Sequence, residues 1–233
     1  MGCFKNSSGF TLNLKLIIDL AKYRIIDLTL TYNQQVAGYQ RELSKSIEND
    51  GWNASTLHLY SHAGTHMDAP LHFGIGTQTI DTFLPGQVMG KAWVAHTLIH
   101  EPQALLEIED LGSIVDHFQA GDSLLIRTDW SKLIGQQQYR NELPRISEAL
   151  AHWCVERQVK MLGVEPPSVA DVNNLKEVTK IHQILLGGNV IIIEGLCNLD
   201  QLNQSEVMLI ALPLKIHQGD GAPARVIALE EKT

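Results

Sequence analysis

The chain is poor in cysteine, with only three in 233 residues. These are Cys3, Cys154 and Cys197, and none belongs to a C-x-x-C pair. So small and odd a number excludes a disulfide framework as the source of stability. We therefore expect a protein of a reducing compartment, the cytoplasm, whose fold is held by its core.

Basic residues and long apolar runs are also scarce. Lysine and arginine total 18 against 26 acidic residues, which gives a net charge of -8. Nucleic acid and anionic lipid attract basic patches, so neither is an expected partner. The longest apolar runs, at 184–186 and 190–193, fall far short of the roughly 20 residues of a membrane helix. With 44% hydrophobic residues and no linker or repeat, the chain is expected to form one domain.

The first 23 residues stand apart from the rest. They begin like an acylation signal, but Asn6 occupies the position where serine or threonine is required. Lys15 and Asp19 interrupt the apolar stretch that a secretory leader would need. We expect residues 1–23 to be an N-terminal extension of unassigned role, and residues 24–233 to form the domain.

The hydrophobic pattern predicts more strands than helices. Strands are expected at 25–31, 56–62, 92–97, 123–128, 160–164, 190–194, 207–212 and 224–229. Helices are expected at 107–118, after the N-cap Ser147, and at 173–186. The pattern is typical of a strand-rich α/β protein.

One segment, S-H-A-G-T-H-M-D-A-P-L-H, concentrates the chemistry. It places His62, His66, Asp68 and His72 within eleven residues, all at even positions. Even positions share a face in extended chain, so a straight stretch would present all four side chains to one volume. Glycine and proline within the segment oppose a helix, and we expect extended chain or loop.

Imidazole nitrogen and carboxylate oxygen together suit zinc or a similar divalent ion. A catalytic site leaves one position open for water, whose pKa the metal lowers towards about 7. The segment therefore predicts a metal-dependent hydrolase. The alternative is a turn with surface histidines, although such clustering of ten histidines by chance is uncommon.

The segment resembles the H-x-G-T-H-x-D-x-P-x-H signature of the cyclase family, which includes bacterial kynurenine formamidases and isatin hydrolases. Further similar stretches are R-I-I-D-L-T at 24–29, L-L-I-R-T-D-W at 124–130, L-G-V-E-P-P-S-V at 162–169 and A-L-P-L-K-I at 211–216. The likeness thus extends from residue 24 to the end. It implies a mixed-sheet swivelling β/β/α fold and a homo-oligomer, either a dimer or a tetramer.

The resemblance also implies roles for individual residues. His62, His66 and Asp68 match the family's metal ligands, and His72 matches its general acid/base. His182 and Glu194 match two further ligand positions near the C-terminus.

Taken by themselves, His182 and Glu194 are less decisive. His182 lies beside a helical apolar stripe, where a lone histidine is ordinarily solvated or hydrogen-bonded. Glu194 ends the run V-I-I-I and would be costly to bury without a cation. Two Zn²⁺ ions bridged by Asp68 and Glu194, or one Zn²⁺ or Mn²⁺ with His182 kept as a catalytic proton-transfer group, both remain open.

The sequence departs from the formamidases around the expected pocket. It has Y-N-Q-Q-V-A-G-Y-Q-R where they carry P-V-W-P-G-D, and Val164-Glu165-Pro166 where they tend to I-D-T. Tyr39 and Glu165 are therefore candidate substrate-binding residues. Glu165 is alternatively a solvated loop carboxylate, the interpretation that we favour.

The predicted function is hydrolysis of an amide-type C–N bond in a small molecule: a formamide, lactam or imide, in the manner of an arylformamidase. A lactone or ester hydrolase, or a cyclase of the same family, is the alternative. A thiol hydrolase would need Cys154 or Cys197, both of which fit core positions better. A non-catalytic binding module would close its metal with four protein ligands.

Overall fold

The computed structural model describes residues 19–97 and 101–232. Its strands are β1 Tyr23–Asp27, β2 Tyr39–Lys45, β3 Ala54–Leu59, β4 His66–Asp68, β5 Met89–His96, β6 Leu105–Leu106, β7 Ser123–Arg127, β8 Arg145–Ile146, β9 Met161–Val164, β10 Ile191–Glu194, β11 Glu206–Pro213 and β12 Gly221–Glu231. Its α-helices are α1 Ile47–Asp50, α2 Ile114–His117, α3 Gln137–Asn141, α4 Glu148–Glu156 and α5 Leu175–Gly187. None of the helices in this part of the chain is long and apolar enough to cross a membrane.

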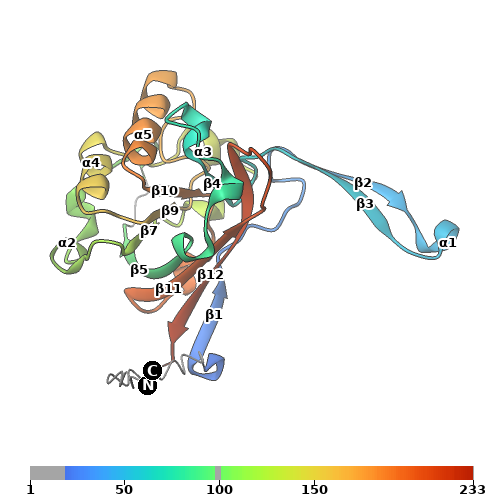
Figure 1. Cartoon of the computed structure of the whole chain (residues 1–233), viewed down its shortest axis with the longest axis horizontal. Coiled ribbons are helices and arrows are strands. Elements are labelled where there is room, and N and C mark those ends of the chain that lie inside the picture. Colours follow the sequence, from blue (N-terminus) through green and yellow to red (C-terminus); the bar gives the residue numbers. More distant parts are fainter. Residues whose placement is uncertain (1–18, 98–100, 233) are drawn as a thin grey trace, which may run out of the picture.

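The main sheet closes on itself. Its eight strands follow the order β1-β12-β11-β5-β7-β9-β10-β4, and β4 pairs with β12 as well as with β10. Strands β5, β7, β9 and β10 run parallel, whereas the other pairs are antiparallel. Helices α2, α4 and α5 lie to one side of this barrel-like sheet (Figure 1). The predicted strand-rich α/β domain with a mixed sheet is confirmed.

Two apolar cores hold the domain together. Along β7, Leu124 and Ile126 belong to the core that includes helix residues such as Leu150, whereas Leu125 belongs to the second core with Met67. Alternate residues of a strand face opposite sides, so β7 is buried on both faces. This explains its uninterrupted apolar sequence.

Several expected elements differ from those observed. The helix predicted at 107–118 is wrong: a 3-10 turn at Ile108–Leu111 and α2 are separated at Gly112, whose φ of 55° and ψ of -135° are not helical. Strand β2 was not predicted, because its sequence Y-Q-R-E-L-S-K is mostly polar. The predicted half-buried strand 56–62 ends earlier, at Leu59, and its side chains are exposed. The expected extension 1–23 lies mostly outside the described residues.

Strands β2 and β3 form a separate hairpin. Within residues 19–97 and 101–232 they pair only with each other, and the hairpin projects well away from the body with α1 at its tip (Figure 1). Its root adjoins the segment that contains His62. The hairpin is called the arm, residues 39–59, from here on.

Gly195, directly after β10, allows the backbone there to pack closely against the backbone at Gly64. Its φ is 68°, and a Cβ there would lie 2.3 Å from the carbonyl oxygen of Gly64. Gly51, in the arm, has a similar φ of 79° but open space around it.

We expect Gly195→Ala to lower the free energy of unfolding by about 3 kcal/mol or more, from the left-handed backbone together with a backbone clash. Gly51→Ala carries the backbone penalty alone, about 1–2 kcal/mol. Chemical denaturation of both variants measures the difference. Equal losses would show that the contact between Gly64 and Gly195 is not tight.

Candidate metal centre

The segment from His62 to His72, expected as extended chain or loop, is extended only in its middle. Only His66 and Asp68 lie on a strand, β4, where they share a face as predicted. His62 lies in the turn before it, bent by Gly64 at a φ of 59°. His72 lies in a 3-10 turn, Pro70–Phe73, that begins with a proline. The side chains converge because the chain bends at both ends of β4.

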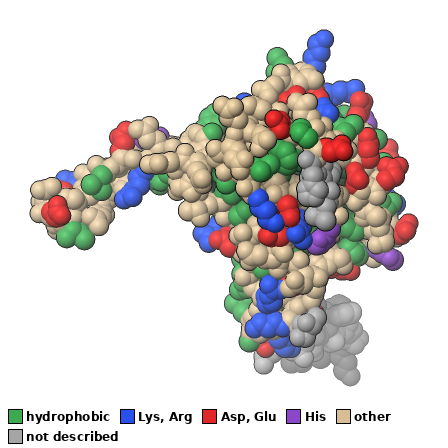
Figure 2. Space-filling model, turned by 180° about the vertical axis from the view of Figure 1, so that it is seen from behind, with side chains coloured by type: hydrophobic (Ala, Val, Ile, Leu, Met, Phe, Trp, Pro, Cys, Tyr) green, Lys and Arg blue, Asp and Glu red, His purple; other side chains and the backbone are tan. Residues whose placement is uncertain are grey.

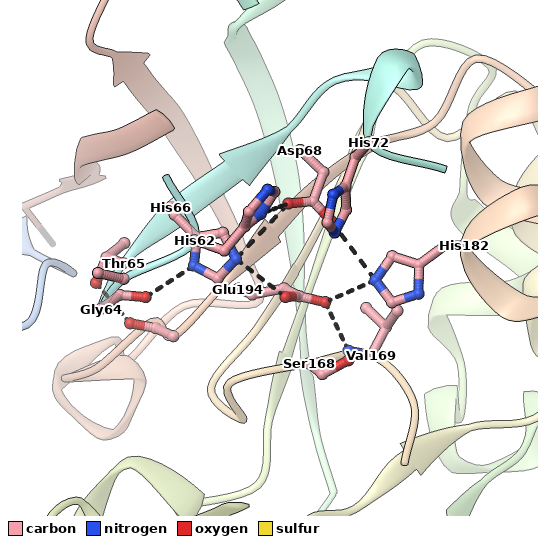
Figure 3. Close-up of polar contacts among 12 residues, drawn as sticks. His62, Gly64, Thr65, His66, Asp68, His72, Ser168, Val169, His182 and Glu194 are labelled. Atoms are coloured by element: carbon pink, nitrogen blue, oxygen red, sulfur yellow. Dashed lines mark hydrogen bonds and ion pairs between the residues drawn. The ribbon is translucent and has the colours of Figure 1, made fainter. Parts of the chain in front are cut away.

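Strand pairing brings distant residues to β4. In the antiparallel pair of β10 and β4, Glu194 is opposite His66. In the pair of β12 and β4, Gly221 is opposite Asp68, which places Asp220 next to the motif. Helix α5 supplies His182 from its buried face. Figure 3 shows the rings of His62, His66 and His182 around the carboxylates of Asp68 and Glu194.

The polar atoms of this cluster lie close together. Glu194 Oε2 is 3.1 Å from His66 Nε2, and Glu194 Oε1 is 3.3 Å from His182 Nε2. Asp68 Oδ1 is 2.8 Å from His62 Nδ1, and Asp68 Oδ2 is 3.5 Å from His182 Nε2. His66, Asp68, His182 and Glu194 are all buried. Two carboxylates thus share one buried volume with three imidazoles.

Backbone carbonyls orient two of the imidazoles. His66 Nδ1 donates to Gly64 O at 2.9 Å, and His182 Nδ1 donates to Val178 O at 2.7 Å. In the neutral ring this leaves each Nε2 unprotonated and directed at the carboxylates (Figure 3). Metal-ligating histidines are held in the same way.

Two buried atoms of the cluster lack hydrogen bonds. Among the described residues, His66 Nε2 and Asp68 Oδ2 are buried and have no hydrogen-bond partner. Such atoms are costly in a protein interior unless a cation meets them. The donor set therefore fits a divalent metal.

The ligand atoms divide into two groups around Asp68. The first group consists of His62, His66 and Asp68. The second group consists of Asp68, His182 and Glu194. Within each group the ligand atoms lie within 4.8 Å of one another. Because Asp68 belongs to both, the arrangement has room for one ion or for two.

The pKa values of several side chains in the cluster are shifted from their usual range. Burial opposes protonation of His62, but Asp68 and Asp220 outweigh it and raise its pKa to about 9. Burial raises the pKa of Glu194, yet His182 and His66 more than offset this and bring it well below its usual range. Burial lowers the pKa of His72. His72 therefore favours the neutral form that can accept a proton.

Asp220 was missed in the sequence. Its Oδ2 is 2.9 Å from His62 Nε2 and 3.5 Å from His72 Nδ1. It lies in Q-G-D-G, directly before β12, and is 158 residues from His62. An acidic residue between two glycines at the start of a strand is only a weak indication of a functional site. The pairing of β12 with β4 is what brings Asp220 to the cluster.

The two candidate substrate-binding residues do not line the cavity of about 550 Å³ that opens beside His62. Glu165 is buried and accepts hydrogen bonds from Thr128 N at 2.7 Å and Ser131 Oγ at 2.8 Å. Its interpretation as a solvated loop carboxylate is therefore wrong. Tyr39 begins β2 and packs edge-on against Tyr32, with ring centroids 5.5 Å apart. A substrate contact for either remains a prediction.

A cavity of about 550 Å³ opens beside His62. Its wall includes apolar and aromatic side chains, namely Leu30, Val36, Ala37, Ile134, Pro167, Tyr60 and Tyr139. Among the described residues that line it, only Arg140 is permanently charged. The cavity is formed by the root of the arm together with the segment around α3.

Neither Cys154 nor Cys197 supports a thiol mechanism. Burial raises the pKa of Cys154 to about 12 and, with nearby carboxylates, that of Cys197 to about 12. A nucleophilic thiol requires a lowered pKa, so both side chains are poor candidates for catalysis.

Comparison with known proteins agrees with this geometry. The family model described as "Putative cyclase" matches residues 26–171. The chain belongs to this family. A kynurenine formamidase of Bacillus mycoides is 30% identical over 210 residues, covering 87% of this chain and 95% of the relative. A kynurenine formamidase of Delftia acidovorans is 30% identical over 180 residues, covering 75% of this chain and 79% of the relative.

Solved structures give the same result. Isatin hydrolase A from Ralstonia solanacearum superposes with a TM-score of 0.82 at 26% identity, covering 97% of this chain and 100% of that one. A structure described as a potential metal-dependent hydrolase with cyclase activity has a TM-score of 0.72 at 25% identity, covering 91% and 100%. These relatives support the predicted assignment to hydrolases of C–N bonds other than peptide bonds, rather than to non-catalytic modules.

We expect a divalent metal to stabilise the folded chain. After chelation and dialysis, Zn²⁺ or Mn²⁺ at a hundredfold excess over its Kd adds about 2.7 kcal/mol, since it binds the folded state alone. In a chain of this size that raises Tm by about 5–10 °C. Asp68→Asn should remove most of the rise, because Asp68 belongs to both ligand groups.

Differential scanning calorimetry with and without metal measures the effect. Glu148→Gln, at an exposed position on α4, is the control and should keep the full rise. The same increase in Asp68→Asn as in the parent protein would place the metal elsewhere.

Proposed function

We propose that the protein is a metal-dependent hydrolase of amide-type C–N bonds in small aromatic substrates. The observation that carries the proposal is the buried cluster of three imidazoles and two carboxylates, with His66 Nε2 and Asp68 Oδ2 lacking hydrogen bonds, beside a cavity. The names of the formamidase and isatin hydrolase relatives support the C–N bond as the target.

His62, His66, Asp68, His182 and Glu194 would hold the metal. A divalent ion bound there lowers the pKa of coordinated water towards about 7 and polarises a substrate carbonyl. His182 directs its Nε2 at Asp68 and Glu194 and is fixed by Val178 O, an arrangement that favours the role of ligand over that of proton carrier. Zn²⁺, with Mn²⁺ as the alternative, suits this nitrogen and oxygen set.

His72 is the proposed general acid/base. It is half-buried and stacks on His62 with centroids 3.7 Å apart. Its lowered pKa leaves it neutral and able to take a proton from the attacking water. It would then return the proton to the leaving nitrogen. Asp220, 3.5 Å from His72 Nδ1, is placed to orient the ring.

The cavity suggests the kind of substrate. Its apolar and aromatic wall suits a planar aryl group, and most ligand sites pair such a wall with a few polar groups. Arg140 is exposed and makes no ion pair with the described residues. We propose that it receives an anionic substituent of the substrate, remote from the scissile bond.

Activity should depend on the metal and on His72. We expect Zn²⁺- or Mn²⁺-loaded protein to hydrolyse members of a panel of aryl formamides, cyclic imides, isatin and lactones. His72→Ala should lower kcat by about 10²–10⁴-fold, the usual contribution of a general acid/base, while the metal-dependent rise in Tm persists. Full activity of the metal-free protein would contradict the mechanism. Turnover of lactones alone would favour the lactone and ester alternative.

The role of Arg140 is tested with matched substrates. For a carboxylated formanilide, Arg140→Gln should raise KM by about 10–100-fold, because charged hydrogen bonds contribute about 1.5–3 kcal/mol. For unsubstituted formanilide the KM should not change. Arg41→Gln, on the arm and outside the cavity lining, is the control. Equal losses with both substrates would assign Arg140 a structural role.

Location in the cytoplasm is a further part of the proposal. It is supported by the free state of Cys154 and Cys197.

A further inference from the structure

One side of the cavity beside His62 is a single stretch of chain, residues 134–141, which contains α3. This stretch contributes the lining residues Ile134, Tyr139 and Arg140, among others. The opposite side is the root of the arm, where Gly38 and Tyr60 line the cavity. Figure 2 shows the arm itself projecting away from the body, as Figure 1 does. Residues 134–141 are called the wall segment from here on.

The wall segment has little burial of its own. Residues 135–138 and 140–141 are exposed, and no residue of α3 is buried. A helix this short is not stable in isolation, because its few hydrogen bonds do not offset the cost of nucleation. The position of the wall segment is therefore set by its contacts with the body.

Glu165 makes such contacts through its side chain and its backbone. Its carboxylate accepts hydrogen bonds from Thr128 N at 2.7 Å and Ser131 Oγ at 2.8 Å, in the turn before the wall segment. Its backbone carbonyl accepts from the hydroxyl of Tyr139 at 3.0 Å. Trp130 Nε1 donates to Tyr139 O at 2.9 Å, which ties the turn to α3. One residue thus holds both the wall segment and the turn that leads into it.

The chain around Glu165 is also connected to the metal cluster. Glu165 is 1% exposed and directly follows β9 of the main sheet. Four residues further on, Val169 N donates to Glu194 Oε1 at 2.7 Å. The loop 165–169 therefore joins the wall of the cavity to a candidate metal ligand.

We propose that Glu165 is a positioning residue that determines which substrates the cavity accepts. It does not line the cavity, so it acts through the wall segment, whose Arg140 it holds at a fixed distance from the metal cluster. That distance selects aryl substrates whose anionic substituent and scissile bond are separated by the same span. The substrate part rests on the proposed function, whereas the hold on the wall segment is measured without substrate.

Two substitutions at Glu165 test this role. Glu165→Ala leaves Thr128 N and Ser131 Oγ without their acceptor. Glu165→Gln keeps both contacts, since the amide oxygen accepts from Thr128 N and the amide NH2 donates to Ser131 Oγ. Burial raises the pKa of Glu165, and glutamine also matches the uncharged form of that carboxyl group.

The first measurement is hydrogen exchange of the full chain without substrate. We expect amides of residues 134–141 to exchange about tenfold faster or more in Glu165→Ala, because hydrogen bonds that hold the segment are lost. In Glu165→Gln they should exchange at the rate of the parent protein. Exchange at the parent rate in Glu165→Ala would overturn the proposal.

Glu230→Ala is the matched control. Glu230 is also 1% exposed and accepts a hydrogen bond from Gln204 N at 2.8 Å, but it lies on β12 and does not line the cavity. The variant should lose stability while residues 134–141 keep the parent exchange rates and the substrate keeps its KM. Equal effects of Glu230→Ala and Glu165→Ala on residues 134–141 would overturn the proposal, since general loosening would then explain both.

The second measurement is steady-state kinetics of the metal-loaded protein with a carboxylated formanilide. KM should rise about tenfold in Glu165→Ala and return in Glu165→Gln, with kcat within about threefold of the parent value. A lower kcat at unchanged KM would overturn the proposal, because a purely structural loss reduces the amount of active protein. If the parent protein hydrolyses none of the panel, the proposed function fails, and hydrogen exchange alone decides the hold of Glu165 on the wall segment.

Ser131→Ala gives the same test if Glu165→Ala does not fold. Ser131 is half-buried and supplies one of the hydrogen bonds to Glu165. Its substitution should speed exchange of residues 134–141 and raise KM by about threefold to tenfold. Exchange at the parent rate in this variant would overturn the proposal.

Discussion

The candidate metal centre depends on the pairing of one three-residue strand, β4, with both β10 and β12. This double pairing closes the sheet, and its register sets Glu194 opposite His66 and Gly221 opposite Asp68. A shift of one residue would turn His66 and Asp68 into the apolar core and Met67 out of it. The same strand register therefore sets both the arrangement of the candidate ligands and the closure of the sheet.

The contact between Gly64 and Gly195 protects this register. Gly64 O accepts the hydrogen bond that orients His66, and Gly195 lets the chain after Glu194 approach that carbonyl. Thr65 reinforces the contact, since its Oγ1 donates to Gly195 O at 2.5 Å and accepts from Leu30 N at 2.8 Å. The threonine of the motif therefore braces the backbone rather than a ligand.

Burying two carboxylates and three imidazoles in the protein interior is costly, because these charged and polar groups lose their hydration. Their mutual attraction offsets part of the cost, and the remaining unsatisfied atoms, His66 Nε2 and Asp68 Oδ2, are those a cation would meet. At Glu165 the same problem has another solution, because hydrogen bonds from Thr128 and Ser131 satisfy that carboxylate. The number of hydrogen-bond donors around each carboxylate distinguishes the candidate ligands from the structural Glu165, and the sequence does not show those donors.

The sequence by itself determined the motif residues, the buried strands of the parallel part of the sheet and the helices α4 and α5, because their periodicity and caps are local. Spacing also placed His66 and Asp68 on one face. Only the tertiary structure decided that Asp220 joins His62 and His72, that Glu165 is buried, and that the arm stands free. These depend on contacts between residues 34 to 158 positions apart in the chain, or on surfaces left uncovered, and no local pattern encodes either.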